Sequence, residues 1–324
     1  MGARKDIISE LPDDVKEKIL ECLPIRDVAR TALLSTDWKD VWLRHGRLVF
    51  DTHFLECLRK CEGDKPVGLV NVINHILLHR AGPVKKFSLC ISCPGLEGPK
   101  PQQSDIDGWC VYLSRNGVEE LNISVFGKQY KLPSCIISCP TIKQLILGGF
   151  NFDIDCPIDG VGGCIFHGVT SLVFYGVEFK SRINGGVVPN LEKISFSFCV
   201  GINNFKICAP KLKSLDLAFV FPAFEPRWLS PHSRLVRAYC LDLLGFGDVA
   251  VVAQEFPTTN LQVIWVIESE FGQITVALEL LERSPNQCEL KIQAENTLSS
   301  RLIDKDLKDA ASRLMKDSSL SIMI

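Results

Sequence analysis

The sequence predicts an α/β fold in which three short N-terminal helices precede a solenoid of parallel strands with intervening helices and loops. Two observations predict it: apolar residues recur at helical spacing in the first fifty positions, and an apolar-x-x-apolar-x-apolar unit recurs along most of the rest. With 324 residues, 46% of them hydrophobic, the chain can bury a sizeable core. We therefore expect a helical module at residues 1–50, the solenoid at 51–292 and a helical tail at 293–324.

The charge balance narrows the possible function classes. The 36 basic residues nearly balance the 38 acidic ones, and no basic stripe carries interleaved aromatic residues, so we expect neither a nucleic-acid nor a membrane partner. No apolar run reaches the length of a membrane span, and residues 1–6 lack a signal-peptide core. The fourteen cysteines are scattered, many among apolar strand residues, which favours reduced thiols in the cytoplasm or nucleus.

The helical module is bounded by helix start and stop signals. The first helix is expected to begin at Pro12, because proline suits a first helical turn, and to end at Pro24. The second helix is expected to turn Leu33 inward. Ser35 or Thr36 then caps the third helix.

The module carries more apolar side chains than three short helices can bury against one another. These residues are Leu11, Ile19, Leu20, Leu23, Ile25, Val28, Leu33, Leu34, Trp38, Val41 and Trp42. An exposed apolar strip of this kind marks a partner surface. The alternative is that the helices pack on the body of the protein.

Several elements of the module resemble an F-box. They are Leu11-Pro12, Ile19-Leu20, Leu23-Pro24, Ser35-x-x-Trp38 and the closing Leu48-Val-Phe-Asp51, with Lys39 where the family often has arginine. The resemblance implies binding to a Skp-type adaptor and, through it, to a cullin. It implies adaptor-facing positions at Leu11, Pro12, Ile19, Leu20, Leu23, Pro24 and Val28.

The body of the chain repeats at the period of leucine-rich repeats. The units are Val84/Phe87/Leu89, Val118/Leu121/Ile123, Ile142/Leu145/Leu147, Val169/Leu172/Phe174, Leu191/Ile194/Phe196 and Leu212/Leu215/Leu217, with weaker copies at Leu235/Ala238/Cys240, Leu261/Ile264/Val266 and Leu290/Ile292. After Leu121 the middle residues lie 21 to 27 positions apart, within the range of leucine-rich repeats. The alternative is an α/β fold with unrelated short strands.

The body also resembles the leucine-rich regions of plant F-box proteins with an FBD-type C-terminus. The resemblance rests on residues 106–123, 139–147, 209–217 and 280–292, and it makes residues 235–292 partly FBD-like. The tail departs from the family, because residues 302–316 read as a charged amphipathic helix.

The side chains between the inward-facing strand residues are expected to line a concave face that binds the target. They include Gln144, Ile146, Val173, Tyr175, Lys193, Ser195, Ser197, Ser214 and Asp216. The mixed, nearly neutral set indicates a target protein or small ligand without strong charge. The alternative is that these are ordinary solvated residues and that the loops bind. Trp228 is either an interface anchor or, preferably, a core filler.

The chemistry-bearing residues form no convincing catalytic or metal site. His75 and His79 share a helix face ahead of Cys90 and Cys93, but the order is reversed from a zinc finger and the cysteine pair begins in a strand. No cysteine stands out as a nucleophile, and we expect no cofactor and no metal. The best prediction is therefore the substrate-recognition subunit of an SCF-type ubiquitin ligase. The alternative is a leucine-rich-repeat scaffold without a degradative role.

Overall fold

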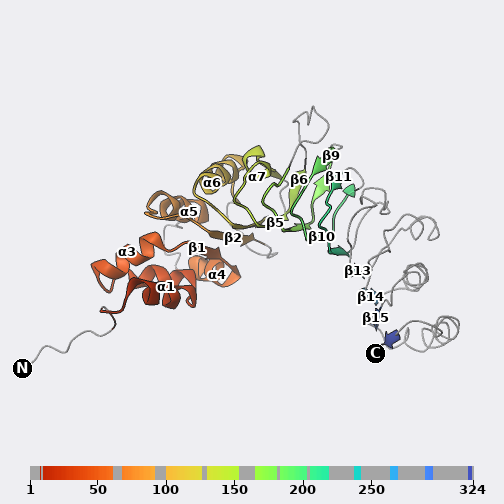
Figure 1. The fold of residues 1–324 in the computed structure, drawn as a ribbon. Helices are drawn as coiled ribbons and strands as arrows, with labels where there is room; N and C mark the ends of the chain where they lie inside the picture. The colour runs from red at the N-terminus through yellow and green to blue at the C-terminus, as the bar shows by residue number, and fades with distance from the viewer. Residues whose placement is uncertain are drawn as a thin grey trace, which may run out of the picture. The chain divides into compact units, whose positions relative to one another are not determined.

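The computed structural model describes residues 8, 10–60, 68–91, 100–125, 130–152, 165–180, 183–202 and 205–218, and the strands at 237–241, 263–268, 289–294 and 320–322 (Figure 1). The chain separates into two compact units. Unit 1 comprises residues 1–128 and 133–144, and unit 2 comprises residues 129–132 and 145–324.

Unit 1 begins with three short helices, α1 (Asp13–Glu21), α2 (Ile25–Thr31) and α3 (Thr36–Arg44), which form the helical module. Pro12 and Pro24 directly precede α1 and α2, where a missing N–H donor has no cost. Ser35 caps α3, because its hydroxyl accepts a hydrogen bond from the Trp38 N–H at 3.3 Å. The three predicted helices are therefore present.

The interior of the module differs from the prediction at one position. Leu20, Ile25, Val28, Trp38 and Val41 are buried. Leu33, expected inward, is 86% exposed, because α2 ends at Thr31 and Leu33 lies in the turn before α3.

The sheet of unit 1 starts directly after the module. Its strands are β1 (Arg47–Phe50), β2 (Lys86–Ile91) and β3 (Glu120–Val125), which pair in parallel in chain order. Leu48 and Phe50 lie opposite Phe87 and Leu89, and all four are buried. The first strand of the solenoid therefore comes from the end of the segment predicted as helical module.

The helices of unit 1 are α4 (Thr52–Lys60), α5 (Leu69–Leu78), α6 (Gln103–Arg115) and α7 (Ser134–Ile137). α6 contacts both α5 and α7 (Figure 1). This is the arrangement of consecutive repeats, in which each strand is followed by a helix or loop that covers the core.

Unit 2 continues the pattern with one strand per repeat, paired in parallel in chain order. The strands are β5 (Gln144–Gly148), β7 (Ser171–Tyr175), β10 (Lys193–Ser197), β12 (Ser214–Ala218), β13 (Arg237–Leu241), β14 (Val263–Glu268), β15 (Glu289–Ala294) and β16 (Leu320–Ile322). Ile194 pairs with Leu172 and with Leu215, as the motif alignment requires. The predicted α/β repeat solenoid is confirmed, and unrelated short strands are excluded.

Shorter strands form two further small sheets in unit 2. β4 (Tyr130–Lys131), β6 (Phe150–Phe152) and β8 (Glu178–Phe179) make one, and β9 (Ile183–Val187) pairs with β11 (Phe205–Cys208) in the other. Their phenylalanines join those of β7 and β10 in a buried cluster with ring centroids 5.1 to 6.3 Å apart. The cluster consists of Phe152, Phe174, Phe179, Phe196 and Phe205.

The C-terminal part is described only through its strands. The helix predicted at 302–316 and the residue Trp228 lie outside the described residues. Residues 320–322, placed in the predicted helical tail, form β16 and pair with β15. Within the part of the chain that is described, no helix has the length and apolar character to cross a bilayer.

Candidate protein-binding surface on the helical module

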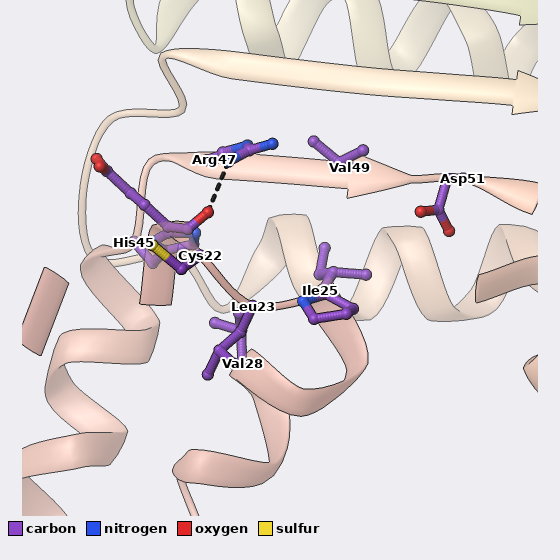
Figure 2. A pocket seen from close by; sticks show the side chains of 10 residues that line it. Cys22, Leu23, Ile25, Val28, His45, Arg47, Val49 and Asp51 are labelled. Carbon is purple, nitrogen blue, oxygen red and sulfur yellow. Dashed lines mark hydrogen bonds between the residues drawn. The ribbon is translucent and has the colours of Figure 1, made fainter. Parts of the chain in front are cut away.

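The corner between α1 and α2 forms one wall of a pocket of about 190 Å³. Figure 2 shows Leu23, Ile25 and Val28 on the helical side, and Arg47 and Val49 on the side of β1. The complete lining is Glu21, Cys22, Leu23, Pro24, Ile25, Val28, His45, Arg47, Val49 and Asp51. The pocket therefore lies where the module meets the first strand of the sheet.

Hydrogen bonds fix the frame of this pocket. The Arg47 guanidinium donates to the Glu21 carbonyl at 2.6 Å, which joins the end of α1 to β1 (Figure 2). The Asp51 carboxylate accepts from the Phe54 N–H at 2.8 Å and caps α4. Both pocket walls are thus attached to regular structure.

A cluster around Arg80 holds the end of α3 to the segment that follows α5. The Arg80 guanidinium donates to the carbonyls of His45, at 3.2 Å, and Trp42. It also lies 4.3 Å from the Trp42 ring centroid, within cation–π range. Burial lowers the pKa of Arg80 to about 10, so the guanidinium stays charged at neutral pH. Within unit 1, the end of the module is therefore held to the segment that follows α5.

His45 lines the pocket as an uncharged group. Burial, followed by the nearby positive charge of Arg80, lowers the pKa of His45 below its ordinary value of 6.5. The imidazole is consequently neutral at physiological pH. This keeps the pocket wall compatible with an apolar contact.

The structure divides the seven residues expected to face an adaptor. Pro12, Ile19, Leu23 and Pro24 are exposed and Leu11 is half-buried. Leu20 and Val28 are buried within the chain, and Val28 is accessible only as part of the pocket lining. Leu20 lies about 100° around α1 from Ile19, and in this structure Leu20 faces the interior whereas Ile19 is 37% exposed.

Two residues of this surface belong to the apolar surplus of the module but are absent from the seven adaptor-facing positions implied by the resemblance. Leu33 is 86% and Leu34 65% exposed, and both lie in the turn between α2 and α3. The signal for them was present, because two consecutive leucines directly before a capping serine cannot both follow the buried face of a helix. The exposed apolar set, called the module strip below, consists of Pro12, Ile19, Leu23, Pro24, Leu33 and Leu34.

Some charged groups of the module are paired with one another. Arg44 contacts Asp13 at 2.9 Å, and Arg30 lies 3.7 Å from Asp27. The ammonium of Lys16, whose stem is buried, lies 5.9 Å from the Trp38 ring centroid. An apolar centre with a polar rim is the usual anatomy of a protein interface.

The nine residues predicted for the concave face all retain solvent contact. Gln144, Tyr175 and Lys193 are exposed, and the other six are half-buried. The strand register aligns Val173, Ser195 and Asp216 in one row across β7, β10 and β12. Lys193 forms an ion pair with Asp216 at 3.0 Å. The structure thus places these residues on one face without showing what that face binds.

The zinc-like set gains no support among the described residues, where no group of three or more candidate ligands converges. The His75 and His79 rings stack with centroids 4.2 Å apart, and Cys93 lies outside the described residues.

Comparison with known proteins places these features in context. Residues 8–50 match the model of the F-box domain. An F-box/FBD/LRR-repeat protein of Arabidopsis thaliana is 36% identical over 220 residues, which cover 67% of this chain and 50% of the relative. An F-box/LRR-repeat protein of the same plant is 25% identical over 303 residues, covering 89% and 59%. The chain thus spans little more than half the length of these curated relatives.

Proposed function

The chain carries an F-box domain joined to leucine-rich repeats of the plant type, and on this basis we propose that it is the substrate-recognition subunit of an SCF-type ubiquitin ligase. In this proposal the helical module binds a Skp-type adaptor, which joins a cullin, and the repeats bind a target protein. The supporting observation is the module strip, whose apolar side chains are exposed although the Arg80 cluster holds the end of α3 within unit 1.

The strip can supply the affinity that such an interface needs. Full burial of a leucine side chain favours association by about 1.5 to 3 kcal/mol. Leu33 and Leu34 are mostly exposed in this chain, so most of that energy is available to a partner. Ile19 and Leu23 add smaller, partly exposed contributions.

The proposed mechanism is positioning rather than chemistry. A subunit that holds a target beside a ubiquitin-charged enzyme raises the effective concentration of the reacting groups. The Arg80 cluster contributes by fixing α3 relative to the first repeats of unit 1. We accordingly propose a non-catalytic role, exerted in the cytoplasm or nucleus.

Replacement of both turn leucines tests the proposal. We expect Leu33→Ala with Leu34→Ala to weaken binding to a purified Skp-type adaptor roughly 100-fold, because most of the strip's aliphatic surface is removed. Binding is measured by titration of the adaptor against the full chain. Thermal unfolding should be nearly unchanged, since neither side chain is in the core.

The matched control is Leu78→Ala, another strongly exposed leucine, which lies on α5 away from the strip. It should leave adaptor binding unchanged. Undiminished binding by the folded double variant would contradict the proposal. If the complex forms but the abundance of its target does not respond to proteasome inhibition, the chain acts as a binding scaffold without a degradative role.

A further inference from the structure

Large apolar side chains are exposed at a second place, far along the chain from the module strip. In the described part of unit 2 they are Tyr175, Phe198 and Val200. Tyr175 is 41% and Phe198 47% exposed, and their ring centroids lie 5.2 Å apart. We propose that Tyr175 and Phe198, the aromatic pair, anchor an uncharged, apolar segment of the target protein, an inference that rests on the proposed function.

The backbone at Phe198 supports a role beyond stability. The residue after β5 is Gly149, after β7 it is Gly176 and after β10 it is Phe198, with φ values of 73°, 58° and 53°. Each of the three donates its N–H to the last carbonyl of the next strand, at Tyr175, Ser197 and Ala218 respectively. The repeat therefore requires a left-handed residue here, which glycine adopts freely and phenylalanine adopts only with strain.

Folding gives little reason for a strained phenylalanine at this position. The interior of unit 2 accommodates five phenylalanines in its buried cluster, whereas Phe198 leaves nearly half of its surface in water. At 47% exposure the ring, which contacts Tyr175, gains only part of the benefit of burial. Strained backbone that persists in a fold is concentrated at functional positions, and aromatic residues dominate binding hot spots.

The ion pairs on the strands that carry the aromatic pair, and on β8, favour an uncharged partner. Lys193 is paired with Asp216 at 3.0 Å, and Lys180 with Glu178 at 3.5 Å. A charged occupant would lose hydration, and the charged groups of these two described pairs already have partners. An apolar occupant has no hydrated charge to desolvate, and it covers both rings.

The open surroundings of the rings favour a protein segment over a small molecule, because small-molecule sites enclose most of their ligand. The backbone register continues the row of Tyr175 and Ser197 to Ala218, which is also an uncharged position. These three neighbouring strands span about 10 Å, the length of roughly three extended residues. We therefore infer a short extended segment with an aromatic or aliphatic side chain seated at the aromatic pair.

The experiment selects phage-displayed random 12-residue peptides on the full chain bound to its adaptor. The enriched peptides should be uncharged and apolar at their centre. Synthetic copies should bind Phe198→Gly about 30-fold and Tyr175→Ala about tenfold more weakly than the unchanged chain. The melting temperature of Phe198→Gly should stay within about 2 °C of that of the unchanged chain. The backbone strain that glycine relieves offsets the stability lost with the contacts of the ring.

Two further variants keep the test specific. Phe198→Asn, which also tolerates the left-handed conformation, should lose peptide binding as Phe198→Gly does. Val111→Ala, at an exposed apolar position of α6, should keep it. The proposal is overturned if no enriched peptide distinguishes Phe198→Gly from the unchanged chain, if those peptides are charged, or if Phe198→Gly melts many degrees lower.

Adaptor titration on the same proteins separates this inference from the proposed function. Phe198→Gly should bind the adaptor normally, whereas the Leu33→Ala, Leu34→Ala variant, selected without adaptor, should keep peptide binding. Loss of peptide discrimination with normal adaptor binding would overturn only the aromatic pair. Failure of the unchanged chain to bind the adaptor would overturn the proposed function, whatever the peptides show.

Discussion

The helical module and the repeats of unit 2 both expose apolar side chains, but for different physical reasons. In the module, short helices have too little interior, and aliphatic residues such as Leu33 remain outside without backbone strain. In unit 2 the interior is large and filled with aromatic rings, yet Phe198 is exposed on a strained backbone. In a small module, an exposed apolar residue indicates a partner surface because the module has more apolar side chains than it can bury. In a repeat, it does so when it departs from the residue type that the repeat pattern requires.

The two regions should respond differently to loss of a core side chain, and the largest effect is expected in unit 2. Phe174→Ala removes the ring at the centre of the buried phenylalanine cluster, so we expect a loss of about 3 to 5 kcal/mol in the free energy of unfolding. Urea unfolding of the full chain measures it. Phe198→Gly is the matched comparison and should cost far less; equal losses would erase the distinction between buried and strained exposed rings.

A smaller effect is expected from detaching the module from its anchor. Arg80→Met removes two charge-assisted hydrogen bonds, to the carbonyls of Trp42 and His45, and the contact with the Trp42 ring. We expect a loss of about 2 to 3 kcal/mol in the free energy of unfolding of unit 1. Hydrogen exchange at α3 should rise as well, because the end of this helix is no longer held.

Arg115→Met provides the control, since Arg115 is an exposed arginine in the last turn of α6. It should change stability by no more than about 0.5 kcal/mol. A similar small effect for Arg80→Met would show that the module does not depend on this cluster.

The sequence predicted the parts of the fold that periodicity controls. The repeat motif placed strands at β5, β7, β10 and β12, because alternating apolar residues leave a single choice of inward face. It did not predict that residues 47–50 begin the sheet, since a four-residue strand has no period of its own. The end of the chain at 320–322 was missed for the same reason.

The candidate surfaces were predicted less completely than the fold. Leu20 and Val28 were assigned to the surface through a resemblance, but burial depends on how α1 and α2 pack, which spacing alone does not determine. Phe198 was overlooked because its exposure depends on a left-handed backbone. The comparison of Gly149, Gly176 and Phe198 becomes possible only after the strands are aligned.

The smallest expected effect is on the pH dependence of stability, and it is expected in the helical module rather than in the repeats. The pKa of His45 is lowered by burial and by the charge of Arg80, while Glu21 opposes the shift; Arg47 acts both ways, since its charge lowers the pKa and its backbone hydrogen bond raises it. A histidine whose folded pKa is below its unfolded value of about 6.5 takes up a proton more readily when unfolded, so its stabilising contribution is complete above that pH and is lost as the pH falls below it.

We therefore expect the melting temperature of the chain to fall between pH 7.5 and 5.5 by more than that of His45→Gln, with the difference confined to the unfolding of unit 1. His167→Gln is the control, because His167 is an exposed histidine of unit 2. The melting temperature of His167→Gln should fall on acidification as much as that of the unchanged chain. If His45→Gln and the unchanged chain lose the same amount on acidification, His45 is not the group that links the stability of the module to pH.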